Sequence, residues 1–441
     1  MTRMKWRQRI AVAVAAALSY GLVATPPAQA AEPAVLDPTA CGGQAQNSFS
    51  GAPRAWQYDR IKPERAWAVT GPDGKKIDGT GIKVAVLDTG AAVTGSPYFD
   101  PAKVKSYNLV GDDADIQDKL GKGAKNFLDC LHGTMVVSLI NGQRVDNGSN
   151  FSGMAPGATV YAMRVLATSD KQEPQDALIR GVQAAIDLKV NVINVSQAGG
   201  DRPELRAVIQ RAIAAGITVV AATGNRSGDD KARYPASYPG VIAVGMSTRS
   251  DAPRPESGYD PAMEVTVAAP GDEVVGLVPS SVDGNGDGKF SAEEIKQRQG
   301  YRIETGTSFA TPLVAGLVAL MLQKEPGLTP GQIRARLQAS ADPPMGQIPD
   351  KQLGFGIINP VQALTKPMPS TGVFTGQDQT RASAPPLPSP VEPDPFPKVV
   401  AVAVGAGSFV LLMLGLVIAE AIPAMRRRRF KPAAPPARPP T

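Results

Sequence analysis

Five short aliphatic runs limit what the central part of this chain can fold into. They are IKVAVLDTG, TVYAMRVL, VNVINVS, ITVVAAT and VIAVGMS, which begin at Ile82, Thr159, Val190, Ile217 and Val241. Each is rich in β-branched residues, which is typical of strands that are buried on both faces. Between the third and fourth runs, PELRAVIQRAIAAG has apolar residues at helical spacing and ends at Gly216. This rhythm predicts an α/β fold with a parallel sheet and helices on both faces.

The first 30 residues have the pattern of a secretory signal peptide. Basic residues precede an apolar run, and AQA at Ala28–Ala30 is a small-residue cleavage site. A retained membrane anchor is the alternative, which the shortness of the apolar run disfavours. We therefore expect residues 1–30 to direct export of the chain.

A second apolar segment, residues 399–422, has the length of a membrane span. The run VVAVAVGAGSFVLLMLGLVIA carries no charge, and a helix needs about 20 apolar residues to cross a bilayer. Arginines at Arg426–Arg429 follow it, and such residues mark the cytoplasmic side. We predict a single-pass protein of the plasma membrane, with the α/β domain outside the cell and a basic tail, residues 423–441, in the cytoplasm.

Three segments lie between these ends. An N-terminal arm, residues 31–75, precedes the α/β domain, residues 76–365. Only about fifty residues lie between Ala31 and the first strand at Ile82, which is short for a separately folding pro-domain and favours a retained arm. A linker, residues 366–398, is rich in proline and poor in aliphatic residues, so we expect an extended spacer.

The charge of the chain is concentrated at its two ends. The formal net charge is +6, but the segments before Ala30 and after Glu420 carry ten basic and no acidic residues, so residues 31–420 carry a net −4. A binding surface for nucleic acid requires a basic patch on the folded domain. We therefore expect no nucleic-acid partner.

Four polar residues lie where predicted strands end or helices begin. Asp88 closes the first strand, and Asn225 follows the fourth. His132, the only histidine of the chain, begins HGTMVVSLI, and Ser308 lies at the start of the long apolar run GTSFATPLVAGLVALMLQ. Taken singly, such residues are most often turn or cap residues. Because chemistry gathers at the carboxyl ends of parallel strands, we expect the four side chains to form one site.

These residue types suit acyl transfer. A serine hydroxyl becomes a good nucleophile when an imidazole takes its proton, and a carboxylate fixes the tautomer of that imidazole. A helix start and a side-chain amide can both donate hydrogen bonds to an oxyanion.

Six motifs, VAVLDTG, HGT, VINVS, AATGN, AAPG and GTSFATP, occur in an order that resembles the subtilisin-like serine proteases. The similarity covers about residues 60–365 and implies a subtilisin-like fold and serine endopeptidase activity. By this resemblance, Asp88 orients His132, which acts as general base and acid for the nucleophile Ser308. The resemblance also implies that Asn225 helps to form the oxyanion hole. It implies no cofactor for catalysis.

The segments around these motifs resemble mycosins, the membrane-anchored subtilases associated with type VII secretion in actinobacteria. The shared features are the signal peptide, CGG at Cys41, RIKPERAW in the arm, DC before the catalytic histidine, the closing GFGIINPVQAL, the linker, the membrane span and the basic tail. This resemblance implies a protein or peptide substrate and, as partners, the membrane and a type VII secretion membrane complex.

The chain departs from the mycosin pattern at several positions. Only Leu131 separates DC from HGT, where mycosins have two residues, and the usual second cysteine pair is absent. Val137 and Ser138 replace the expected Ala and Gly, and Ala198 stands where subtilases often have a substrate-facing glycine. A structural scaffold of a secretion complex, with a dispensable or occluded protease site, is the alternative function. The intact catalytic set favours the endopeptidase.

Cys41 and Cys130, the only cysteines, are expected to form a disulfide that holds the arm beside His132. An oxidising compartment favours pairing, although two unpaired thiols are the alternative. Loop closure would contribute roughly 4 kcal/mol to the free energy of unfolding. Mass spectrometry of a non-reduced digest should detect the linked peptides, and two free thiols would contradict the prediction.

An insertion before the nucleophile, DGNGDGKFSAEE, residues 283–294, matches the calcium-binding loop of an EF-hand. The predicted metal ligands are Asp283, Asn285, Asp287, the carbonyl of Lys289, Ser291 and Glu294. The preceding VVGLVPSSV lacks a helical pattern, so we expect half of the usual unit. A solvated turn is the alternative, because three glycines in the loop favour one.

We expect millimolar calcium to raise the melting temperature of the chain, because a structural ion that binds only the folded state stabilises it by mass action. Replacing Asp283 and Glu294 together by alanine should remove this rise. A calorimetric titration without calcium binding would identify the insertion as an ordinary turn.

Overall fold

The computed structural model describes residues 34–35, 54–93, 98–110, 130–144, 149–166, 176–225, 233–260, 263–278, 300–367, 422–423 and 426. The chain divides into two compact units, residues 1–376 and 377–441. The predicted signal peptide, calcium loop, linker, membrane span and basic tail lie wholly or almost wholly outside the described residues, so they stay predictions.

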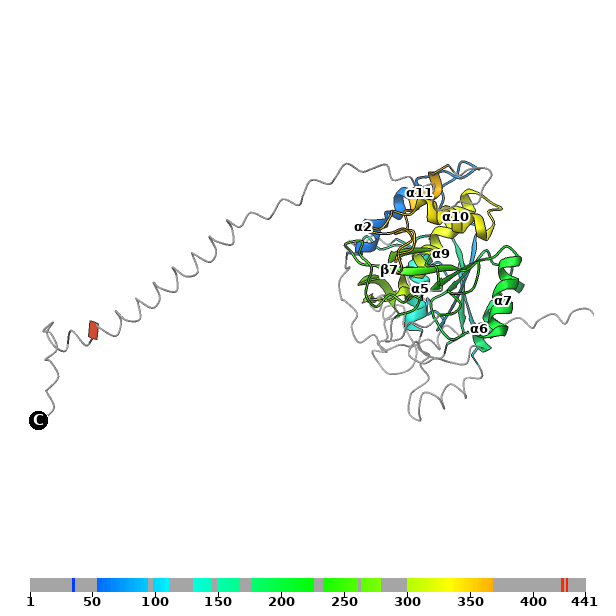
Figure 1. The fold of residues 1–441 in the computed structure, drawn as a ribbon, viewed down its shortest axis with the longest axis horizontal. Helices are drawn as coiled ribbons and strands as arrows, with labels where there is room; N and C mark the ends of the chain where they lie inside the picture. Colours follow the sequence, from blue (N-terminus) through cyan, green and yellow to red (C-terminus); the bar gives the residue numbers. More distant parts are fainter. Residues whose placement is uncertain are drawn as a thin grey trace, which may run out of the picture. The chain divides into compact units, whose positions relative to one another are not determined.

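An eight-stranded sheet forms the centre of the first unit (Figure 1). In spatial order its strands are β1 (Ala34–Val35), β3 (Val104–Asn108), β4 (Thr159–Arg164), β2 (Lys83–Asp88), β5 (Val192–Val195), β6 (Thr218–Ala222), β7 (Ile242–Ser247) and β8 (Val267–Pro270). Neighbouring strands are parallel, except that β1 runs antiparallel to β3. All five predicted strands are confirmed, and β1, β3 and β8 were not predicted.

Helices cover both faces of this sheet, as predicted. On one face lie α5 (Leu131–Asn141) and α9 (Thr307–Lys324), and on the other lie α6 (Asp176–Asp187) and α7 (Pro203–Ala214). Alternate residues of β2 belong to the two cores: Val84 packs with α5 and α9, whereas Ala85 packs with α6 and α7. This alternation is the pleat of a strand that is buried on both sides. Figure 1 shows α6 and α7 side by side.

The helix α9 is apolar on all sides because the domain encloses it. It is the one helix among the described residues that is long and apolar enough to cross a membrane, and 83% of its most apolar window is buried. A helix that is apolar all round requires such an enclosed position. The sequence of α9 is therefore explained by the core of the domain.

A two-stranded antiparallel hairpin, β9 (Val274–Val278) and β10 (Gly300–Glu304), stands apart from the main sheet. The predicted calcium loop belongs to the segment between these two strands. The hairpin itself was not predicted, although the absence of a helical pattern before the loop agrees with β9.

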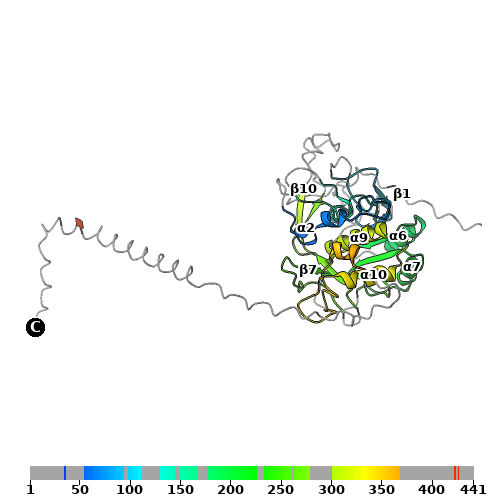
Figure 2. The ribbon, with the colours of Figure 1, turned by 90° about the horizontal axis from the view of Figure 1, so that it is seen from above.

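Two short helices of the arm, α2 (Trp56–Ile61) and α3 (Pro63–Trp67), are built into the domain. Gln57 of α2 is fully buried, and its amide donates to the carbonyl of Val275 at 2.5 Å and accepts from the Val275 amide at 3.3 Å. The arm thereby supplies a side-chain partner to the edge of β9. Figure 2 shows α2 close to the hairpin to which β10 belongs. On another side, α3 packs against α11 (Pro360–Thr365), which follows α10 (Pro330–Ser340).

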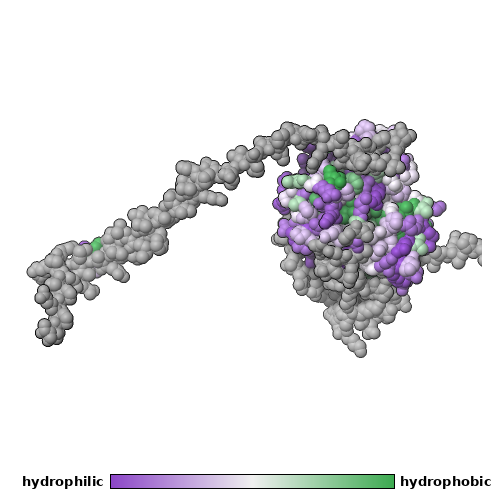
Figure 3. Space-filling view, in the orientation of Figure 1, coloured by the Kyte–Doolittle hydropathy of each residue, from purple (hydrophilic) through white to green (hydrophobic). Residues whose placement is uncertain are grey.

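The described surface of the first unit is mostly hydrophilic on the face that Figure 3 draws, with small separate apolar spots. Among the described residues of this unit, Ile303 and Met345 are the large apolar side chains that are exposed. Apolar residues scattered singly in this way are normal for a globular surface.

Replacement of Gln57 by alanine should lower the free energy of unfolding by about 2 kcal/mol, because the backbone N–H and C=O of Val275 would lose their buried partner. Chemical denaturation of the full chain measures the change. Replacement of the exposed Gln210 is the matched control, with an expected change below about 0.5 kcal/mol. An equal effect of the two substitutions would contradict the structural role of Gln57.

Candidate active site

Asp88 and His132 form a hydrogen-bonded pair at the carboxyl end of the sheet. Asp88 is the last residue of β2 and is 1% exposed, and its Oδ1 lies 2.8 Å from Nδ1 of His132 in the first turn of α5. The Thr89 amide also donates to this oxygen, at 2.7 Å. When Nδ1 donates to a carboxylate, the other ring nitrogen, Nε2, is the one that can accept a proton.

The glycine of HGT lets α5 approach the turn that follows β2. A methyl group on Gly133 would lie 2.0 Å from the carbonyl oxygen of Gly90, so no side chain fits there. The Gly133 amide instead donates to Oγ1 of Thr89 at 3.0 Å. The Asp88–His132 distance therefore depends on this close contact between helix and turn.

Ser308 is the second residue of α9 and is 8% exposed. The ring of the next residue, Phe309, lies 5.1 Å from the ring of His132, centroid to centroid, which places the imidazole beside the start of α9. Four positions on, Pro312 has no N–H to donate to the Ser308 carbonyl. That carbonyl accepts instead from Oγ of Ser196, at 2.8 Å, in the loop after β5.

Asn225 faces the same space as Ser308. Its Oδ1 accepts from the backbone amide and the hydroxyl of Thr307, at 3.0 and 3.2 Å. These two bonds leave the Nδ2 side of the amide as the donor. A methyl group on Gly306 would lie 3.0 Å from Oγ of Ser308 and 3.2 Å from Nδ2 of Asn225, so the two groups flank the space beside this glycine.

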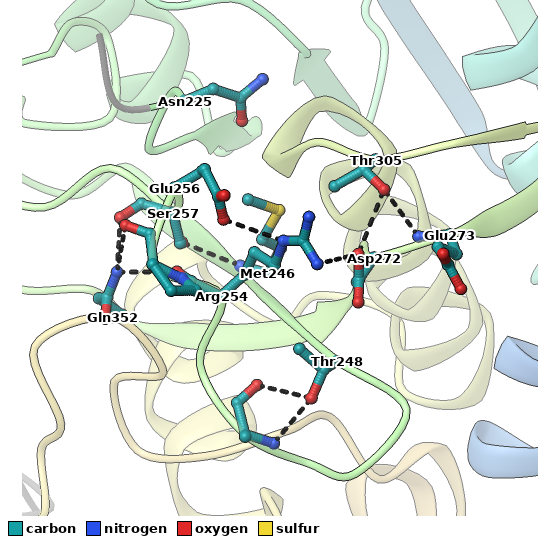
Figure 4. A network of polar contacts seen from close by, with 12 residues as sticks. Asn225, Met246, Thr248, Arg254, Glu256, Ser257, Asp272, Glu273, Thr305 and Gln352 are labelled. Carbon is teal, nitrogen blue, oxygen red and sulfur yellow. Dashed lines mark hydrogen bonds and ion pairs between the residues drawn. The ribbon is translucent and has the colours of Figure 1, made fainter. Parts of the chain in front are cut away.

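A polar network supports the loop that carries Asn225 (Figure 4). Asn225 forms an isolated antiparallel bridge with Ser257, whose carbonyl accepts from Nε2 of Gln352 at 2.8 Å. Gln352 also donates to the carbonyl of Arg254, at 2.9 Å. Arg254 pairs with Asp272 at 3.1 Å, so the network reaches the loop before β9.

The loop before β9 in turn holds the start of α9. Thr305 donates to the carboxylate of Asp272 at 3.2 Å and accepts from the Glu273 amide at 2.9 Å (Figure 4). One residue further on, the Gly306 amide donates to the carbonyl of Gly271 at 2.8 Å. The segments that carry Asn225 and Ser308 are therefore linked through side chains remote from both.

The structure brings Asp88, His132, Ser308 and Asn225 together, as expected from the strand ends. Cys130 immediately precedes α5 and is fully buried. Its expected partner, Cys41, lies outside the described residues, so the pairing stays a prediction.

The six predicted calcium ligands also lie outside the described residues. Within the part of the chain that the structure describes, no group of three or more His, Cys, Asp or Glu residues could hold a metal ion. No role was predicted for Ser196 or Thr307, although they lie inside the motifs VINVS and GTSFATP. A polar residue that ends a buried strand was the available signal for Ser196.

The subtilase family profile matches residues 79–356 of the chain. Mycosin-1 of Mycolicibacterium smegmatis is 30% identical, over 82% of this chain and 88% of that protein. Fervidolysin of Fervidobacterium pennivorans is 29% identical and subtilisin E of Bacillus subtilis is 31% identical, over 68% and 60% of this chain. The chain spans only 42% of fervidolysin and 61% of subtilisin E.

Solved structures that resemble this chain belong to the same kinds of protease as these relatives. The crystal structure of MycP1 with its N-terminal propeptide removed has a TM-score of 0.54 and 28% identity, and the match covers 72% of this chain and 99% of that one. A cold-adapted subtilisin-like serine proteinase has a TM-score of 0.50 and 26% identity, over 69% of this chain and 98% of that one. Together with the parallel sheet, these matches confirm a subtilisin-like α/β fold. The chain belongs to the subtilase family and is a mycosin-like member of it.

Proposed function

We propose that this chain is an extracytoplasmic serine endopeptidase that hydrolyses peptide bonds through Ser308, His132 and Asp88. The observation that carries the proposal is the 2.8 Å pairing of Asp88 with His132 beside the start of α9. Membership of the subtilase family supports it.

In this mechanism Nε2 of His132 takes the proton of Ser308 as Oγ attacks the scissile carbonyl carbon. Asp88, buried against Nδ1, stabilises the imidazolium that forms. The imidazolium then gives its proton to the leaving amine. Water attacks the acyl-enzyme in the second half of the reaction, with His132 again as the base.

The oxyanion of each tetrahedral intermediate lies in the space beside Gly306 that Asn225 borders. Nδ2 of Asn225 donates to it, and the N–H groups at the start of α9 provide further donors. The 18-residue helix α9 adds the positive end of its dipole. Because Thr307 fixes the amide of Asn225, little reorganisation accompanies the charge that develops.

We further propose that the enzyme is anchored in the plasma membrane by residues 399–422 and works beside a type VII secretion membrane complex. The support is the similarity to mycosin-1, together with a solved relative described as MycP1 from the ESX-1 type VII secretion system. The uncharged run in residues 399–422 and the arginines after it support the anchor.

A fluorophosphonate probe should label Ser308 covalently in the full-length chain purified in mild detergent. Replacement of Ser308 or His132 by alanine should lower peptide turnover by a factor on the order of a million, because the nucleophile and its base act as a unit. Replacement of Ser340, a buried serine of α10, is the matched control and should leave labelling intact.

Mass spectrometry of the labelled peptide identifies the modified serine. Undiminished hydrolysis by the Ser308→Ala chain would exclude this residue as the nucleophile. A folded wild-type chain that neither reacts with the probe nor cleaves peptides would favour the scaffold function.

A further inference from the structure

Two loops at the carboxyl end of the sheet contact the first residues of α9. Residues 196–200 follow β5, and residues 223–225 follow β6. The first loop contacts the Ser308 carbonyl through Ser196, and the second contacts Thr307 through Asn225. We call the space between these two loops the acyl slot. The residue on the acyl side of the scissile bond, P1, carries the carbonyl that Ser308 attacks, so its side chain lies beside the start of α9, which both loops contact.

The two loops touch each other across the acyl slot. A methyl group built on Gly224 would lie 3.0 Å from Cβ of Ala198 and 2.5 Å from Cδ of Arg233. Because a methyl carbon is about 1.5 Å from its Cα, the Gly224 Cα lies within roughly 4.5 Å of the first atom and 4 Å of the second. These are contact distances for carbon atoms. Gly224 is accordingly buried.

A side chain could pass between two walls only if they were about 7 Å apart, since carbon atoms in contact need 3.5–4 Å on each side. The methyl group of Ala198 and the aliphatic stem of Arg233 leave less than that beside Gly224. The acyl slot is therefore closed at this point by two side chains of the protein itself.

The backbone holds Arg233 in this position. The next residue, Tyr234, pairs with Gly199 of the first loop through two hydrogen bonds of 2.8 and 3.0 Å. The Arg233 carbonyl accepts from the amide of Ser237 at 2.9 Å and from its hydroxyl at 2.8 Å. The backbone at Arg233 is thus fixed to the first loop, beside the slot that the Arg233 side chain helps to close.

We propose that Ala198 and Arg233 restrict the enzyme to substrates with a small P1 side chain, such as alanine, glycine or serine. This inference rests on the proposed endopeptidase function. A larger P1 side chain would have to displace the Ala198 methyl group and the Arg233 stem before the carbonyl reached Ser308. The restriction is steric, so it depends on the alkyl stem of Arg233 and does not depend on its charge.

The test compares succinyl-Ala-Ala-Pro-Xaa p-nitroanilides, with Ala, Phe or Glu as Xaa, as substrates of the full-length chain. We expect kcat/KM for the Ala peptide to exceed that for the Phe peptide by roughly tenfold or more. Arg233→Ala and Ala198→Gly each open the acyl slot and should raise the Phe-to-Ala ratio by roughly tenfold. Arg233→Lys keeps the stem as far as Cδ and should keep the wild-type ratio.

Arg211→Ala, which removes an arginine from the outer helix α7, is the control and should also keep the wild-type ratio. A gain in Phe hydrolysis is an effect that mere destabilisation would not produce. Fluorophosphonate labelling shows which variants retain a folded site. Arg233→Ala and Ala198→Gly change different segments of the chain, so each tests the inference independently.

Equal hydrolysis of the Ala and Phe peptides by the wild-type chain would overturn the inference and leave the proposed function standing. A preference for Glu would replace the steric explanation by one based on the charge of Arg233, and would overturn it as well. A preference for Ala that neither opening variant relaxes would exclude these two residues as its cause. If the wild-type chain cleaved no peptide and resisted the probe, the proposed function and this inference would fall together.

Discussion

The close approach of α5 to the turn after β2 is the contact on which the pairing of Asp88 with His132 depends. Gly133 permits it, because any side chain there would collide with the Gly90 carbonyl. Thr134 strengthens it by donating to the Cys130 carbonyl at 2.6 Å and accepting from the Ala92 amide at 2.8 Å. The motif HGT therefore combines His132 with two residues, Gly133 and Thr134, that hold the helix and the turn together. A longer side chain at position 133 would separate Asp88 from His132 without altering either.

Ser308 is positioned by a second feature, Pro312, which lies within the first turns of α9. By withholding an N–H, Pro312 frees the Ser308 carbonyl, and Ser196 uses that acceptor to bring the loop after β5 against the helix. An ordinary helix would satisfy the carbonyl internally and leave this loop without its anchor. The loop that borders the acyl slot is therefore placed by Ser308, the proposed nucleophile.

Most of the central sheet could be predicted from the sequence because its strands are buried on both faces and read as continuous aliphatic runs. The strand β3 could not, since VKSYN is partly exposed and alternates weakly. The hairpin of β9 and β10 could not be predicted for another reason. Its partner in the arm, Gln57, is 218 positions from Val275 in the sequence. The positions of Asp88, His132, Ser308 and Asn225 were predictable because strand ends and helix starts are local features. The contact of Arg233 with Gly224 was not, because it depends on how two loops meet.

The arm and the nucleophile are joined by a continuous chain of contacts. Nε1 of Trp56 donates to the carbonyls of Asp272 and Glu273, at 3.1 and 3.0 Å. The same loop fixes Gly306 through the carbonyl of Gly271 and Arg254 through the carboxylate of Asp272. Loss of α2 would therefore expose the edge of β9 and loosen the loop on which the start of α9 rests. Because that loop also contacts the network behind Asn225, a single arm helix stabilises the segments that carry both Asn225 and Ser308.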